Sequence, residues 1–225
     1  MKVTENGIKI YDGRSKIFPP DWLKGKINAT ATAPDSSKIG MDTTIINTAM
    51  DKYPAGMIKK ELMHVYLVGK LQFSGEIFFG TNSRWDVYIA SDNNNVVEKT
   101  FHHEFSSILL RRYSAFRFED KWKKLSPGSL NTTSSKALKK GYNSPGFEPE
   151  LLEIGYLDLY SLSNWENDFN MYAENIFAGD PAFWKIADTY SIVKEKMKLA
   201  VELYTKVNPI FTESYFRFLV PDPKQ

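Results

Sequence analysis

Two segments restrict the fold of this chain most. One is a short apolar run, and the other, further along the chain, is a stripe of apolar residues at helical spacing. The run "MHVYLVGKLQF" (residues 63–73) is rich in β-branched and aromatic residues, which predicts a buried strand. The segment "EIFFGTNSRWDVYIAS" (76–91) predicts two more extended pieces around a turn at residues 80–83. A helix is predicted from about Asn94 to Arg112, because its apolar positions recur at helical spacing. Those positions are Val97, Phe101, Phe105, Ile108 and Leu109.

The remaining pattern is mainly helical. The clearest helix begins at Pro181, with Asp180 as its N-cap, and continues to about Lys206. Shorter helices are predicted over residues 42–52, 57–62, 118–125, 135–140, 165–177 and 211–219.

The first forty residues differ from the rest of the chain. The stretches "FPPDW" and "TATAPDSSKIG" carry many Pro, Gly and Ser residues, which predicts an irregular arm with short extended pieces over residues 1–40. We expect residues 41–225 to form a single domain. The predicted fold class is α+β: a small N-terminal sheet packed on the helix of residues 94–112, followed by a mainly helical C-terminal half.

Composition excludes several classes of function. The chain has no cysteine, so thiol catalysis, disulfides and thiolate metal sites are excluded. Its formal net charge of +2 provides no field that would favour nucleic acid. No apolar run is long enough for a transmembrane segment, and the first residues lack the apolar core of a signal peptide. Aromatic residues make up 14% of the chain, and we expect most of them to fill the core.

The helix of residues 94–112 contains half of a metal-binding motif. In H-E-x-x-H the two histidines lie one helical turn apart and hold zinc, while the glutamate acts as general base. Here His103 and Glu104 match the first half, but Ser107 stands where the second histidine belongs. A serine hydroxyl is a poor zinc ligand. A purely structural explanation is also open, in which His102 or His103 is hydrogen-bonded inside the fold.

The stretch "TFHHEFSSILLRRY" resembles the active-site helix of a family of zinc-binding metallopeptidases, mostly predicted surface lipoproteins of bacterial nutrient-import loci. "HVYLVGKLQF" before it and "NWENDFNMYAENIF" after it are similar to other segments of the family. The resemblance covers roughly residues 42–216. It implies a zincin-like fold, with a twisted sheet above the helix and a substrate along the sheet's edge strand. It also implies a periplasmic or outer-membrane-anchored location on the cell surface.

The same resemblance implies roles for single residues. His103 matches the first zinc ligand, Glu104 the general base and Ser107 the lost second ligand. The third ligand of the family is an acidic residue on a later helix. Aligning on "AE" places Glu174 there, whereas aligning on "DF" places Met171 there, with Asp168 three residues earlier as the alternative carboxylate. Either carboxylate could instead belong to a solvated helix face.

The sequence leaves three hypotheses open. The first is a metallopeptidase-like protein with an incomplete zinc site, either holding zinc or lacking it. It would act as a non-catalytic or weakly active accessory protein that binds a peptide or glycan. The second is an active zinc metallohydrolase that uses His103, Glu104 and a downstream carboxylate. The third is an aromatic-rich domain that binds glycans or proteins through exposed Trp or Tyr side chains, and in which the His-Glu pair is structural.

Overall fold

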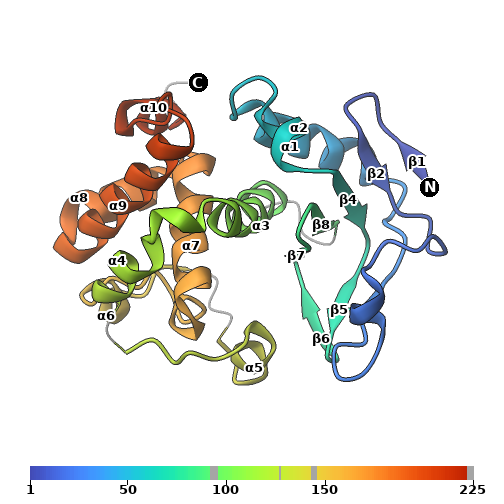
Figure 1. Ribbon diagram of the computed structural model, residues 1–225, viewed down its shortest axis with the longest axis horizontal. Helices are drawn as coiled ribbons and strands as arrows, with labels where there is room; N and C mark the ends of the chain where they lie inside the picture. Colours follow the sequence, from blue (N-terminus) through green and yellow to red (C-terminus); the bar gives the residue numbers. More distant parts are fainter. Residues whose placement is uncertain (92–95, 127, 143–145, 222–225) are drawn as a thin grey trace. The chain divides into compact units, whose positions relative to one another are not determined.

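The computed structural model describes residues 1–91, 96–126, 128–142 and 146–221. The chain divides into two compact units, residues 1–109 and 110–225. The predicted arm of residues 1–40 falls within the first unit, and its separation from residues 41–225 as a domain stays a prediction. The expected extended pieces of this arm are present as short strands. The α+β class is confirmed, with both sheets in the first unit and helices in the second (Figure 1).

The main sheet of the first unit has five strands in the order β1-β2-β4-β8-β7. Its central strands β2, β4 and β8 are parallel, and the outer strands β1 and β7 are antiparallel to their neighbours. The strands are β1 (Lys2–Val3), β2 (Ile8–Ile10), β4 (His64–Val68), β8 (Asp86–Ala90) and β7 (Gly80–Asn82). β4 and β8 are buried over most of their length, as expected for parallel strands covered on both faces.

The apolar run of residues 63–73 is two strands rather than the single strand predicted. β4 belongs to the main sheet, whereas β5 (Leu71–Phe73) pairs with β3 (Thr30–Ala31) and β6 (Glu76–Phe78) in a second sheet. The chain leaves the main sheet at Gly69, where a Cβ atom would lie 2.4 Å from the Ala33 carbonyl oxygen. Glycine permits this close approach of two backbone segments, and an apolar pattern does not show to which sheet a strand belongs.

The predicted turn at residues 80–83 is also misplaced. Residues Gly80–Asn82 form the edge strand β7, and the reversal follows, where the Ser83 N–H donates to the Asp86 carbonyl at 2.8 Å. The Ser83 hydroxyl accepts from the backbone N–H groups of Trp85 and Asp86. Ser83 thus holds this turn through hydrogen bonds from the backbone two and three residues ahead to its side chain.

The helices of the first unit agree with the prediction. The α-helices are α1 (Ile39–Asp51), α2 (Met57–Glu61) and α3 (Val97–Arg112), of which α3 crosses the boundary between the units. The short 3₁₀ helix η1 (Pro20–Leu23) lies in the segment predicted to be irregular. The predicted start of α3 near Asn94 lies outside the described residues. The apolar stripe of α3 is almost completely buried, which confirms its assignment as the core-facing side.

The second unit consists of helices. They are η2 (Ser114–Phe116), α4 (Phe118–Lys124), α5 (Ser134–Lys139), α6 (Pro149–Leu152), η3 (Ser161–Ser163), α7 (Trp165–Ala178), α8 (Pro181–Thr189), α9 (Ser191–Val207) and α10 (Glu213–Phe218). The single long helix predicted from Pro181 is broken, because Tyr190 is extended (φ −98°, ψ 119°). The apolar stripe continues across this break, because α8 and α9 pack side by side on a shared core (Figure 1).

Aromatic side chains fill the cores of both units, as predicted. In the first unit Tyr66 and Tyr88 stack with centroids 5.0 Å apart, and Phe18 and Trp22 pack beside them. In the second unit the rings of Tyr204, Phe211 and Phe216 pack against Phe177. Throughout the described part of the chain, the helices are too short or too polar to cross a membrane.

Candidate functional site

Glu104 of α3 lies against the edge strand β7. The Asn82 side-chain amide donates to Glu104 Oε2 at 2.5 Å. A Cβ atom at Gly80 would lie 2.9 Å from Glu104 Cγ and 2.4 Å from Thr100 Cγ2, so only glycine lets the strand approach the helix this closely. Glu104 is half-buried. The candidate general base is therefore held beside the strand along which the resemblance places a substrate.

The two adjacent histidines of α3 have different surroundings. His102 has no exposed surface, and its Nδ1 lies 2.9 Å from the hydroxyl of Tyr53, whose ring also packs against it. Its Nε2 lies 3.5 Å from Glu98 Oε1. His102 is thus a hydrogen-bonded core residue. His103, the candidate ligand, is 9% exposed.

Glu98, one turn before His102, ties this region to α1. Its carboxylate forms an ion pair with Lys52, the residue that follows α1. Burial acts to raise the pKa of Glu98, but His102 and Lys52 together outweigh it through hydrogen bonds and charge. The pKa of Glu98 consequently lies below its ordinary value.

Ser107 is 2% exposed and occupies the helical position one turn after His103. Its neighbour Ser106 donates its hydroxyl to the His103 carbonyl at 2.7 Å, a bond to the preceding turn that serine often makes inside helices. Both serines are buried in this helix, and neither supplies an imidazole that could bind a metal. The site on α3 therefore offers one imidazole where the complete motif offers two.

The candidate third ligands lie on α7 in the second unit, where Glu174 is 9% exposed and Met171 is half-buried. Asp168 has no exposed surface and is held by the Lys196 ammonium at 2.6 Å, the Trp122 indole N–H at 2.7 Å and the Ser126 hydroxyl at 2.8 Å. This carboxylate is thus the anion of a buried ion pair.

Aromatic rings surround the cation of the same pair. The Lys196 ammonium lies 4.2 Å from the centroid of the Tyr156 ring and 5.3 Å from that of Trp122, and it also donates to the Gly155 carbonyl at 2.8 Å. Burial raises the pKa of Asp168 against the opposing effect of Lys196, and burial lowers the pKa of Lys196 against that of Asp168. Both charged forms are therefore costly here, and each is stabilised mainly by the other.

The donor set does not fit a complete catalytic zinc site. Such a site normally has three protein ligands and an open position for water. His103 with one carboxylate would supply two, and Ser107 replaces the third. Over the described ranges, no group of three or more His, Cys, Asp or Glu side chains could hold a metal ion together.

A second histidine–carboxylate arrangement was not foreseen from the sequence. His64 begins β4 and Asp86 begins β8, and the parallel register places them side by side with His64 Nδ1 2.8 Å from Asp86 Oδ1. The Ser83 hydroxyl donates to Asp86 Oδ2 at 2.7 Å. The sequence predicts that His64 lies in a strand. No local feature of the sequence predicts the strand order that brings Asp86 beside it.

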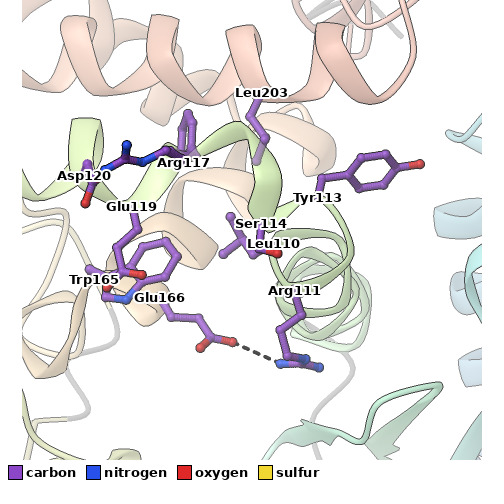
Figure 2. A pocket seen from close by; sticks show the side chains of 11 residues that line it. Leu110, Arg111, Tyr113, Ser114, Arg117, Glu119, Asp120, Trp165, Glu166 and Leu203 are labelled. Atoms are coloured by element: carbon purple, nitrogen blue, oxygen red, sulfur yellow. Dashed lines mark hydrogen bonds and ion pairs between the residues drawn. The ribbon is translucent and has the colours of Figure 1, made fainter.

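A pocket in the second unit was also missed. It has a volume of about 330 Å³ and lies between the end of α3, α4, the start of α7 and α9. Figure 2 shows Trp165, Arg111 and Glu166 around it, with an ion pair of 3.3 Å between Arg111 and Glu166. No local signal in the sequence predicts this ion pair, because the carboxylate that meets Arg111 comes from a distant helix.

The comparisons with known proteins agree with this fold. Among solved structures the chain is similar to that of a putative zinc-binding metallo-peptidase from Bacteroides caccae ATCC 43185. The TM-score is 0.52, and the match covers 81% of this chain and 73% of that chain at 16% sequence identity. Comparison with protein families gives no match, and comparison with curated proteins gives none. At this identity the likeness shows that the two chains share a fold, and it shows no more than that.

Proposed function

We propose that this chain is a metallopeptidase-like protein with an incomplete zinc site, which acts as a non-catalytic or weakly active accessory protein. The observation that carries the proposal is the buried Ser107, one helical turn after His103 on α3. A hydrolytic site that lacks a bound Lewis acid loses the activation of its water, the main contribution of zinc in this chemistry. Among the candidate third ligands we favour Glu174, since Asp168 is committed to Lys196.

A peptide is the ligand that the edge strand supports best. The Phe79 carbonyl accepts from the Ala90 N–H at 2.7 Å, and the Ser83 N–H donates to Asp86, so alternate residues of this segment bond to β8. Gly80, which lies between them, directs its backbone N–H and C=O groups toward the edge of the sheet. An extended peptide could bond to these groups as an added strand.

The proposed place of action is the bacterial periplasm or outer-membrane surface. This part of the proposal is supported only by the resemblance of "TFHHEFSSILLRRY" and its flanking segments to the family of surface lipoproteins.

Metal analysis of untagged protein tests the incomplete site. We expect less than one zinc per chain after dialysis against zinc, and a zinc affinity about tenfold or more higher in Ser107→His, because that change restores the motif. Addition of His103→Ala to Ser107→His should abolish the gain, and Ser107→Ala serves as the control for loss of the hydroxyl.

Two outcomes would contradict the proposal. Stoichiometric zinc in the unaltered chain that disappears in both His103→Ala and Glu174→Gln would establish the second hypothesis, an active metallohydrolase with an unorthodox ligand set. No gain of affinity in Ser107→His would show that residue 107 does not face a metal site, and the zincin-like assignment of α3 would then fail.

A further inference from the structure

The pocket of the second unit combines an aromatic platform with paired charges. Trp165, the first residue of α7, is half-buried and lines it. Among the described residues nothing contacts its indole through a hydrogen bond, an aromatic ring or a cation. An indole usually uses both its ring face and its N–H where it is partly buried. Trp165 therefore offers a stacking surface and a donor that the fold itself does not use.

The floor and the rim of the pocket differ in character. Leu110, Phe118 and Leu203 are buried and supply apolar surface. The rim carries the guanidinium of Arg111, paired with Glu166 at 3.3 Å, and that of Arg117, paired with Asp120 at 2.9 Å (Figure 2). A ligand with an apolar face and polar edges would match this arrangement.

The charges of the rim select against ionic ligands. Two guanidiniums stand against three carboxylates, since Glu119 also lines the pocket. A free anion would be repelled by those carboxylates, and a free cation would be repelled by the guanidiniums. To bind, either would have to displace an existing ion pair. A neutral ligand with several hydroxyls can donate to Glu166 and accept from Arg111 while their ion pair stays in place.

We propose that this pocket binds a neutral pyranose sugar, stacked by its C–H face on Trp165 and hydrogen-bonded by its hydroxyls to the Arg111–Glu166 pair. The volume of about 330 Å³ suits a small ligand, because pockets for small molecules span ~300–1,000 Å³. The site uses only residues of the second unit, and it is independent of zinc, of His103 and of the function proposed for α3.

The test is a binding assay on the full chain with individual neutral sugars. D-glucose, D-galactose, D-mannose and N-acetyl-D-glucosamine are titrated at millimolar concentrations and followed by saturation-transfer NMR and calorimetry. We expect at least one of them to bind, Trp165→Ala to weaken that binding by about tenfold or more, and Trp165→Phe to retain part of it, because the phenyl ring preserves the platform. Glu166→Gln should weaken binding without abolishing it.

Trp85→Ala is the matched control. Trp85 is also half-buried, but it lies in the first unit with Arg84 over its ring, and its loss should leave sugar binding unchanged. Circular dichroism and thermal unfolding establish that each variant is folded. Trp165→Phe and Glu166→Gln keep the test decisive if Trp165→Ala does not fold.

Three results would overturn the inference. These are binding of none of the four sugars, sugar binding that Trp165→Ala and Glu166→Gln leave unaltered, and stronger binding of acetate or tetramethylammonium than of every sugar. The last result would show that a charged ligand displaces an ion pair of the rim.

Discussion

Two carboxylates that the sequence singled out have opposite surroundings. Glu104 in the first unit is half-buried and meets the neutral amide of Asn82 beside an edge strand. Asp168 in the second unit is fully buried and meets the ammonium of Lys196 within a set of aromatic rings. A carboxylate beside an open edge can act on a ligand, whereas a dry carboxylate paired with a buried cation holds its own core together. The contrast shows why position on a helix does not by itself assign a role.

The largest effect is expected from Lys196→Met, which leaves the Asp168 charge buried without its cation. We expect a loss of ~3–5 kcal/mol in the free energy of unfolding, measured by chemical denaturation at pH 7. Lys198→Met on the exposed face of α9 is the matched control, with a change within ~0.5 kcal/mol. The double variant Lys196→Met with Asp168→Leu should recover much of the loss. A loss below ~1 kcal/mol in Lys196→Met would show that Asp168 is not a core carboxylate.

The sequence could predict what depends on neighbouring residues. The stripe of α3, the N-cap Asp180 and the alternation of helices and strands are all local signals, and they located most elements. It could not predict the break at Tyr190, because the apolar stripe continues through it, nor the division of residues 63–73 between two sheets. Both depend on what packs against the segment.

The residues of the candidate site divide in the same way, into those with a local signal in the sequence and those whose role depends on tertiary packing. His103, Glu104 and Ser107 follow from the motif, since spacing on one helix is a local property. The role of Asp168 does not, because its cation lies 28 residues away and only tertiary packing buries the two together. The partner of His64 was hidden for a similar reason, since the parallel pairing of β4 with β8 has no local signal.

The second-largest effect tests how closely the edge strand β7 approaches α3 beside Glu104. Gly80→Ala adds a Cβ atom 2.4 Å from Thr100 Cγ2, so β7 must move away from α3. We expect a loss of ~1–3 kcal/mol in stability, measured by thermal unfolding. Gly40→Ala is the control: a Cβ there meets nothing within 4 Å in α1, so this change should stabilise by up to ~1 kcal/mol. Equal effects of the two changes would contradict the close approach of β7.

A smaller effect tests the half-buried ion pair of Glu98 with Lys52, which lies in the first unit together with Glu104. The pKa of Glu98 is lowered in the folded protein, so its stabilising contribution is present above the unfolded value near 4.5 and is lost as the pH falls through the lower folded value. Glu98→Gln should therefore cost ~1 kcal/mol at pH 7, and the difference from the unaltered chain should shrink as the pH falls from 4.5 through the lower folded pKa of Glu98. Urea denaturation across this range measures it. A difference that is constant with pH would show that the carboxylate charge contributes nothing.

The smallest effect is expected for Glu104, the first of the two carboxylates compared above. Glu104→Gln keeps an oxygen that can accept from Asn82, and the side chain is only half-buried, so stability should change by less than ~0.5 kcal/mol. Asp168→Asn, the same loss of charge in the dry site, should cost several times more, because it strands the ammonium of Lys196. Chemical denaturation of both variants under one condition measures the ratio. If Glu104→Gln were as costly as Asp168→Asn, Glu104 would be a structural carboxylate, and its placement beside the edge strand would no longer support a peptide-binding role.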